Sequence, residues 1–341
     1  MAKDGSGGNQ ETNRPAQVRA VLFDTRGPDR ALSADELEGA SPGQDQLLWV
    51  DVEAGAVPSA LEATLPLARR LGMRGLEARG LDAGGGASLR NHDDWFLVQV
   101  VAVESEDGVR FGGHPLLLLC GQRVVISVHV GGLGFLDALR AREQADSRIG
   151  ALGAESFAAS LLGWLVDGYL DAVSKLEAEV DRLEVSLLAS RRHRHCLPEL
   201  ARLRRAASRL RRLLAPHRAV FGAMARPDFR PDADTHVDRH FRALEQRFER
   251  AMDAVENARD LVVGTFELYS SRSAERTNDT MRVLTFVTVL LGTLALMAGV
   301  LGMNFQAPFF EAGARGFWTA VCAMAGLTAA ALLLARWRRW I

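Results

Sequence analysis

The sequence predicts an α+β domain that is followed by long helices and then by two C-terminal membrane-spanning helices. Three observations predict this fold class. Strand-like and helical patterns alternate over residues 18–150, and helical periodicity covers most of residues 151–282. Two apolar runs without a charged side chain follow. A chain of 341 residues is long enough for several such parts.

The composition excludes several classes of protein. A formal net charge of -1 gives no general positive field of the kind that nucleic-acid-binding proteins carry. Cys120, Cys196 and Cys322 lie far apart, which argues against a disulfide framework or a zinc ribbon. There is no phosphate-binding loop and no nucleophile–base pair, so we expect neither an enzyme nor a cofactor. Residues 1–17 are polar and are expected to form a disordered tail.

The first domain, residues 18–150, is expected to mix strands with helices. Helices are predicted at Ser59–Leu71 and Gly134–Gln144. The tripeptide Glu106-Asp107-Gly108 has the chemistry of a tight turn, so we expect a hairpin there. Short β-branched and aromatic runs predict strands at Val18–Phe23, Leu47–Val52, Trp95–Val103, Pro115–Leu119 and Val124–Val128.

Residues 151–232 are predicted to form a cytoplasmic helical hairpin. An amphipathic pattern covers 155–188, and a second helix, rich in arginine, is expected from Pro198 to Ala223. Its basic face suits an anionic partner or lipid headgroups, but a solvated helix face is the simpler interpretation. His193, His195 and Cys196 offer metal-binding atoms at the bend, although no second ligand pair follows and a solvated turn is favoured.

A third helix is expected to begin near Asp234 and to run without a break into the first apolar run. Gly264 is the only helix-weakening residue before the apolar run, and no proline occurs on the way. Residues 233–282 are therefore predicted to form a stalk that couples the soluble part to the membrane.

The apolar runs at 283–303 and 317–335 are each long enough to cross a bilayer as a helix. A loop, residues 304–316, joins them, and a basic tail follows at 336–341. The two runs form a hairpin whose two ends lie on the same side of the membrane. Arginines precede the first run and follow the second, so the positive-inside rule places the N- and C-termini in the cytoplasm. We therefore expect a multi-pass protein of the inner (plasma) membrane.

Two helices cannot enclose a pore, so any pore must be formed by several copies of the chain. The first span is the better candidate for lining it, because it carries Thr285, Thr288, Gly292, Thr293 and Gly299. Small residues and threonines also pack membrane helices together, and the sequence alone does not separate these interpretations.

One pattern in this region resembles a known family. Asn278-x-x-Met281-x-x-Leu284-Thr285 is followed by a spanning helix that ends in Gly302-Met303-Asn304-Phe305. This pattern closely resembles the CorA family of divalent metal cation transporters, and the similarity in organisation extends over the whole chain. It implies a funnel-shaped homopentamer in a lipid bilayer, with the first span lining the pore.

The resemblance also implies roles for individual residues. Gly302, Met303 and Asn304 would form an outer selectivity filter, in which Asn304 binds the metal ion through its hydrating water. Met281 and Leu284 would form the gate. Acidic side chains would lie at the two mouths, Glu267 on the cytoplasmic side and Glu311 outside. The other pore-lining positions would be Asn278, Thr288, Gly292, Ala295 and Gly299.

The transported ion remains open between Mg²⁺ and Zn²⁺, with Co²⁺ and Ni²⁺ also conceivable. Mg²⁺ gives up its inner water reluctantly, and neutral Asn304 amides suit a hydrated ion. The segment from Leu213 to Arg218, however, is similar to the ZntB zinc-transporting branch. The second hypothesis is therefore a zinc transporter that is coupled to protons. A third hypothesis is a membrane sensor or scaffold that conducts nothing and works through its Arg-rich helix.

Overall fold

The computed structural model describes residues 16–76, 86–142, 148–189, 196–230, 235–303 and 313–338. It divides into two compact units, Met1–Thr265 and Phe266–Ile341. Helix α7 (Thr235–Leu301) contributes residues to both units.

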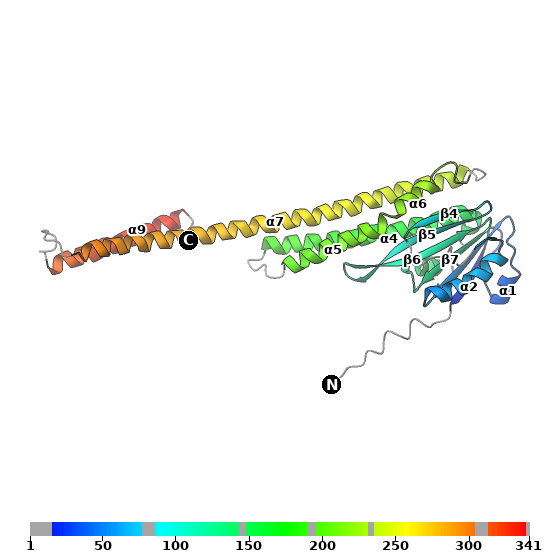
Figure 1. Cartoon of the computed structure of the whole chain (residues 1–341), viewed down its shortest axis with the longest axis horizontal. Coiled ribbons are helices and arrows are strands. Elements are labelled where there is room, and N and C mark those ends of the chain that lie inside the picture. Colours follow the sequence, from blue (N-terminus) through cyan, green and yellow to red (C-terminus); the bar gives the residue numbers. More distant parts are fainter. Residues whose placement is uncertain are drawn as a thin grey trace, which may run out of the picture. The chain divides into compact units, whose positions relative to one another are not determined.

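The first unit is built on a seven-stranded sheet with the order β2-β1-β3-β7-β6-β5-β4 (Figure 1). All neighbouring strands are antiparallel except β3 and β7, which are parallel. Buried residues dominate β3 and β7, as expected for strands covered on both faces. The strands are β1 (Gln17–Asp24), β2 (Arg30–Leu32), β3 (Gln46–Ala54), β4 (Ser88–Asn91), β5 (Phe96–Asp107), β6 (Arg110–Cys120) and β7 (Val124–Val130).

Helices cover both faces of the sheet and create two hydrophobic cores. Alternate side chains of the strands point to opposite faces, so Trp49 belongs to one core and Val50 to the other. One face carries α1 (Ala34–Glu38) and α2 (Val57–Arg70). The other carries α3 (Gly134–Arg142), α4 (Ala154–Ala189), α5 (Cys196–Leu214), α6 (His217–Met224) and the first part of α7, with a short 3₁₀ helix at Arg148–Ala151.

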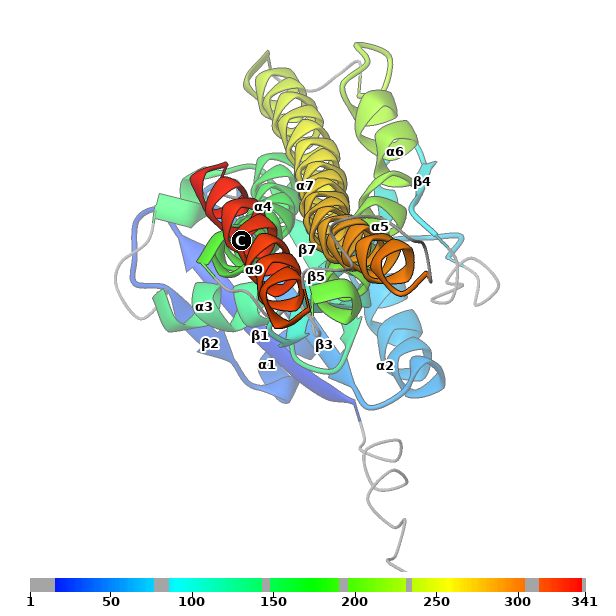
Figure 2. The same ribbon diagram turned by 90° about the vertical axis from the view of Figure 1, so that its left-hand side faces the viewer.

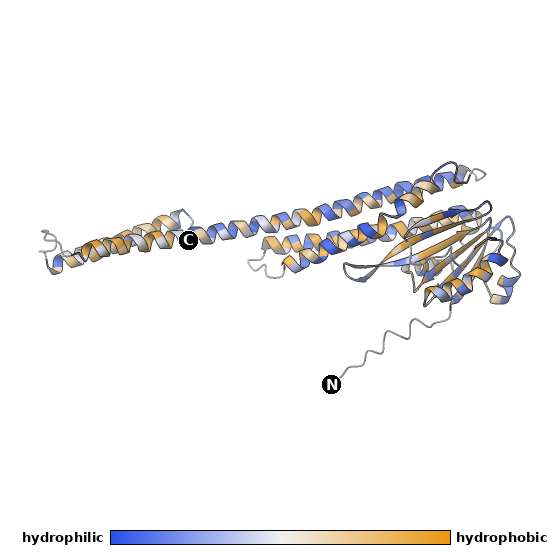
Figure 3. Ribbon diagram, viewed as in Figure 1, coloured by the Kyte–Doolittle hydropathy of each residue, from blue (hydrophilic) through white to orange (hydrophobic). Residues whose placement is uncertain are grey.

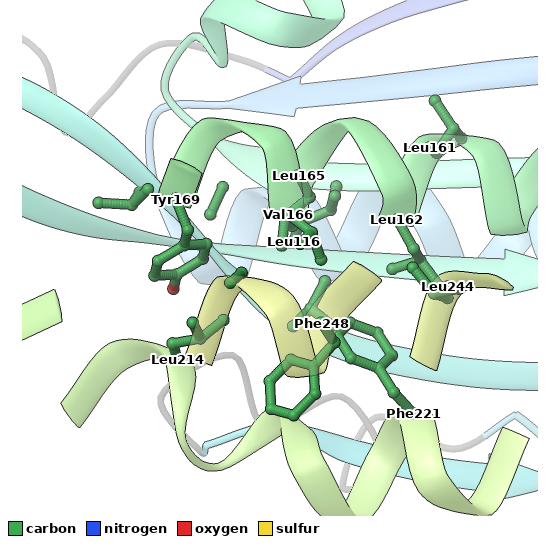
Figure 4. Packing of buried hydrophobic residues seen from close by; sticks show 14 of the residues in the cluster. Leu116, Leu161, Leu162, Leu165, Val166, Tyr169, Leu214, Phe221, Leu244 and Phe248 are labelled. Atoms are coloured by element: carbon green, nitrogen blue, oxygen red, sulfur yellow. The ribbon is translucent and has the colours of Figure 1, made fainter. Parts of the chain in front are cut away.

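The larger core joins the sheet to the long helices. Figure 4 shows Tyr169 and Val166 of α4 packed near Leu116 of β6, and Phe221 of α6 facing Phe248 of α7. The rings of Phe221 and Phe248 lie 5.3 Å apart in an edge-to-face arrangement. Residues 18–150 and 151–232, which the sequence divided into two domains, therefore share one core, and the first part of α7 completes it.

Most of the predicted elements are present. The five predicted strands correspond to β1, β3, β5, β6 and β7, and β5 and β6 form the expected hairpin. Four short elements were not predicted: α1, β2, β4 and the 3₁₀ helix at Arg148–Ala151. β2 and β4 pair at the two edges of the sheet and have few buried residues, so they lack the apolar run by which a strand is found.

The single helix predicted from Pro198 to Ala223 is wrong, because the chain forms two helices there. α5 ends at Leu214, and α6 begins at His217 after Pro216. Proline has no N–H to continue the helical hydrogen bonds, and its ring clashes with the preceding turn. The amphipathic pattern continues across the break, which is why it was missed.

A cluster of buried polar residues joins α3 to the middle of the sheet. Asp51 on β3 accepts hydrogen bonds from Ser127 on β7 and from Arg140 on α3. Its carboxylate also lies 3.2 Å from Nε2 of His129. Burial alone would raise the pKa of Asp51, but the hydrogen bond and charge of His129, together with the charge of Arg140, hold that pKa below its usual value. The same carboxylate raises the pKa of His129 against the opposing effect of burial.

His217 and Tyr169 cover an open stretch of β5. β4 pairs with β5 only as far as Gln99, so within the described part of the chain no strand pairs with the backbone of Val101 on that side. Nε2 of His217 accepts a hydrogen bond from the Val101 N–H at 2.9 Å, and the Tyr169 hydroxyl donates to the Val101 carbonyl at 2.8 Å. The proton of His217 is therefore on Nδ1, 2.9 Å from the Leu214 carbonyl, and burial lowers the pKa of His217 to about 4.

Within the first unit, charged and polar contacts tie α7 to the neighbouring helices. Arg247 pairs with Asp167 of α4 at 2.7 Å. Glu249 pairs with Arg218 of α6, also at 2.7 Å. At the end of the unit, the hydroxyl of the buried Thr265 donates to Glu184 of α4 at 2.6 Å.

The second unit contains the remainder of α7 and α9 (Ala314–Trp337), which lie side by side (Figures 1 and 2). Among the described residues, α7 and α9 are the helices that are long and apolar enough to cross a membrane. Figure 3 shows this part of α7 and α9 as mainly hydrophobic. The continuous helix predicted from Asp234 into the first span is confirmed, although it ends at Leu301, two residues before the predicted end. α9 begins three residues before the span predicted at 317–335 and ends two residues after it.

The buried His217 leads to a pH-dependent stability. The folded chain holds this ring neutral down to pH of about 4, whereas the unfolded chain takes up a proton below about 6.5. We expect the free energy of unfolding to fall by up to about 3 kcal/mol as the pH drops across that window, and to be unaffected by this group above it. Denaturant unfolding of the purified chain in detergent, followed by tryptophan fluorescence, measures the loss.

The variant His217→Gln removes the titrating ring and is expected to lose less stability between pH 6.5 and pH 4 than the wild type. His236→Gln, at an exposed histidine of α7, is the matched control and should keep the wild-type slope. An unchanged slope in His217→Gln would contradict the assignment.

Candidate functional site

The candidate site residues that lie on α7 share one side of that helix. At about 100° per residue, they fall within a sector of about 120° around the helix axis. From Asn278 to Gly302 this sector is about 36 Å long, at about 1.5 Å per residue. We call it the uncovered face, and Thr285 also lies in this sector; the predicted site residues on it are Glu267, Asn278, Met281, Leu284, Thr288, Gly292, Ala295 and Gly299.

No part of the described second unit covers this face. Every one of its residues is exposed, and Met281 and Leu284 have 54% and 57% of their surface accessible. In the apolar part of α7, from residue 283 onward, the partly buried residues lie on the opposite side of the helix, and α9 is the other helix described in this unit. They are Phe286, Leu290, Leu294, Met297 and Leu301. These residues were not singled out from the sequence, although their spacing of three to four residues is the signal that predicts a packed seam.

The charged side chains near the start of the apolar run lie outside the uncovered face. Arg272 pairs with Glu275 at 3.6 Å, and Arg282 pairs with Asp279 at 3.7 Å. All four lie on the half of the helix away from the sector, as does Arg276. From Asn278 to Gly299 the sector is therefore neutral, with polar groups between small and apolar ones. Glu267 is exposed and is the one acidic residue of the set that the structure describes.

Thr288 presents hydrogen-bond acceptors on this face. Its hydroxyl donates to the Leu284 carbonyl at 2.8 Å, which uses the only hydrogen of the group and leaves its lone pairs free. Gly292 and Gly299 have no atom within 4 Å of where a β-carbon would lie, so their lack of a side chain is not required by this chain's own packing. The uncovered face can therefore accept hydrogen bonds from water without placing a charged side chain beside that water.

The helix ends immediately before the Gly-Met-Asn tripeptide. The Gly302 N–H donates to the Ala298 carbonyl at 2.9 Å, and Met303, which is 51% exposed, follows in a bend. A β-carbon at Gly302 would lie 3.2 Å from the Ala298 carbonyl oxygen, which is a tight contact. Asn304 and Glu311 lie outside the described residues, so their predicted roles remain predictions.

A second region with acidic groups lies in the first unit, between β5, α3 and α4. A hollow of about 310 Å³ is lined by Glu104, Asp171 and Lys175 among others. Asp171 pairs with Lys175 at 2.7 Å, and Glu104 accepts a hydrogen bond from the Gly134 N–H at 2.9 Å. In the described ranges no three His, Cys, Asp or Glu side chains are grouped to hold a metal ion. His193 and His195 lie outside those ranges, and Cys196 is buried.

Residues 44–336 match the profile of a protein family described as CorA-like Mg²⁺ transporter protein. Among curated proteins, the chain is 32% identical over 147 residues to the cobalt/magnesium transport protein CorA of Thermotoga maritima, which is 43% of this chain and 41% of that protein. It is 27% identical over 181 residues to the divalent cation transporter CmaX of Pseudomonas aeruginosa, or 53% of this chain and 54% of the relative. The chain thus aligns with about half the length of these relatives.

Solved structures share the fold over nearly the whole chain. The CorA magnesium transporter of Methanocaldococcus jannaschii has a TM-score of 0.72 at 19% identity and covers 94% of this chain and 98% of its own. Full-length CmaX has a TM-score of 0.65 at 23% identity, with coverage of 94% and 97%. The ZntB cytoplasmic domain of Vibrio parahaemolyticus has a TM-score of 0.53 at 13% identity over 75% of this chain and 98% of its own.

The tight contact at Gly302 can be tested by substitution. Gly302→Ala places a methyl group against the Ala298 carbonyl and is expected to cost about 1 kcal/mol, lowering the midpoint of thermal unfolding in detergent. Gly326→Ala on α9 is the control, because outside the backbone of its own helix a β-carbon there meets no atom within 4 Å, and alanine favours a helix interior by about 1 kcal/mol. Equal midpoints for the two variants would show that the close approach at Gly302 is absent.

Proposed function

Because this chain belongs to the family of CorA-like Mg²⁺ transporter proteins, we propose that it passes divalent metal cations across a membrane through a pore lined by the uncovered face of α7. The observation that supports this proposal most directly is the position of α9. It covers one side of α7 and leaves the opposite side, with its polar and small residues, exposed.

A polar helix face that no other described part of the second unit covers is unfavourable in hydrocarbon. Within the first span, the Thr285 hydroxyl on this face has no hydrogen-bond partner among the described residues, and in hydrocarbon it would stay unsatisfied at a cost of roughly 1–3 kcal/mol. Several copies that turn this face toward a common axis remove the cost, because the polar groups then line a water-filled path. We propose a homopentamer, the assembly that the family resemblance implies.

The residues of the uncovered face and those that follow it in the chain have complementary roles in the proposed pore. Asn304 amides accept hydrogen bonds from the water that a Mg²⁺ ion retains, so the hydrated ion is recognised without being held tightly. Met281 and Leu284 offer no acceptor and form an apolar gate, closed to a hydrated ion until the ring widens. Gly302 and Met303 complete the outer filter, and Glu267 and Glu311 concentrate cations at the mouths.

The proposed orientation follows from the arginines at the ends of the two spanning helices. Arg272, Arg276 and Arg282 precede the first span, and Arg336 and Arg338 follow the second. With these cationic side chains on the cytoplasmic side of the inner (plasma) membrane, both termini are cytoplasmic. Residues 18–282 then form the cytoplasmic part, with 233–282 as the stalk, and residues 304–316 form the outer loop.

Zinc is the second candidate cargo. The segment from Leu213 to Arg218 is similar to the ZntB branch, and the ZntB cytoplasmic domain shares the fold over 75% of this chain. Proteoliposome flux with Mg²⁺ or Zn²⁺, each with and without a pH gradient, separates a passive Mg²⁺ pathway from proton-coupled Zn²⁺ transport. We expect Mg²⁺ flux without a pH gradient; Zn²⁺ uptake that requires the gradient, with no Mg²⁺ flux, would overturn the magnesium assignment.

The filter is tested in the same assay with Asn304→Ala. Loss of the amide acceptors is expected to reduce divalent cation flux at least about tenfold, which corresponds to about 1.4 kcal/mol. Asn257→Ala, at an exposed asparagine of α7 in the first unit, is the matched control and should conduct like the wild type. Unchanged flux in Asn304→Ala would contradict the filter, and a wild-type chain without any flux would favour the sensor or scaffold.

A further inference from the structure

Thr285 differs from the other threonines of the second unit in the state of its hydroxyl. Threonines in membrane helices commonly donate to the carbonyl four residues earlier, which satisfies the group locally. Thr277, Thr280, Thr288 and Thr293 of α7 do so at 2.8–3.0 Å, as do Thr319 and Thr328 of α9 at 2.6 and 2.8 Å. Among the described residues, Thr285 is exposed and has no such bond.

The surroundings of Thr285 place it beside the proposed gate. It lies in the same sector of α7 as Asn278 and Met281, one turn beyond Met281 and two turns beyond Asn278. A hollow on the surface of the helix is lined by Asn278, Met281, Arg282, Thr285, Phe286 and Val289. Arg282 is paired with Asp279 and lies outside the sector, so the polar groups on the uncovered side of this hollow are those of Asn278 and Thr285.

The Asn278 amide is also without a hydrogen-bond partner in the described part of the chain. Two unsatisfied polar side chains, about 10 Å apart along the helix, therefore bracket the apolar Met281 and Leu284. A hydroxyl that has not donated its hydrogen keeps one donor and two acceptor sites and can rotate, whereas that of Thr288 is fixed by its bond to the Leu284 carbonyl. Thr285 is thus suited to exchange hydrogen bonds with water that moves past it.

We infer that Thr285 and Asn278 form two polar rings on either side of the Met281–Leu284 gate, and that they accept hydrogen bonds from the hydration shell of the cation as it crosses the apolar ring. This inference rests on the proposed function, because it requires that the uncovered face line the pore. Thr285 acts on the water around the ion, so the barrier for passage through the gate depends on its hydroxyl.

The test is the initial rate of Mg²⁺ flux through Thr285→Val, which keeps the shape of the side chain and removes the hydroxyl. We expect a reduction of at least about fivefold, equivalent to about 1 kcal/mol. Thr285→Ser restores a hydroxyl and should conduct within about twofold of the wild type. Thr319→Val on α9 is the matched control, because the Thr319 hydroxyl is likewise bonded to a backbone carbonyl, that of Arg315, and α9 carries none of the proposed pore residues; it should also stay within about twofold.

The thermal midpoint and the mass of the assembly in detergent are measured for each variant. A hydration role leaves both unchanged in Thr285→Val, whereas a contact between copies would lower the midpoint or break the assembly. Wild-type flux in Thr285→Val, or a loss of assembly that accounts for its lower flux, would overturn the inference. If the proposed function itself is wrong, the result is different, because the wild type then shows no divalent cation flux.

Discussion

The uneven packing of α7 against α9 is the constraint on which the second unit depends. α9 lies beside α7, where Phe286, Leu290 and Leu294 are partly buried, and no described residue of the second unit covers the far side of α7. On that side the Thr288 hydroxyl and the Asn278 amide alternate with Met281 and Leu284, so the face suits neither lipid alone nor a packed core. Assembly around a shared axis would satisfy both kinds of residue, which is why we propose a pore.

The first unit gives α7 a firm base. Its N-terminal part is buried against α4, α5, α6 and the sheet, through residues such as Phe248 and Val255. Ion pairs to Asp167 and Arg218 fix its register, and the bond from Thr265 to Glu184 holds it at the end of the unit. Because α7 continues as one helix to Leu301, a rearrangement of this core can be passed along the helix backbone to Met281 and Leu284.

Long periodic elements and the family were predictable from the sequence, whereas short elements and side-chain states were not. The apolar runs, the unbroken α7 and the CorA resemblance carried by Gly302-Met303-Asn304 are confirmed. β2 and β4 were not predicted because edge strands bury few residues. The break at Pro216 was not predicted because the amphipathic pattern continues across it. The missing backbone bond of Thr285 depends on the rotation of one side chain, about which sequence periodicity says nothing.

The central claim is that the uncovered face of α7 meets water in the assembled protein, and cysteine accessibility in proteoliposomes tests it most directly. Cys322 is first replaced by alanine, because it is exposed, whereas Cys120 and Cys196 are buried. Cysteines at Gly292 and Ala295 are then compared with cysteines at Leu290 and Leu294 for reaction with a charged, water-soluble methanethiosulfonate. We expect the first pair to react at least about tenfold faster, since only a hydrated thiol ionises and reacts readily. Equal and slow reaction at all four positions would show that this face contacts lipid or protein and would contradict the pore.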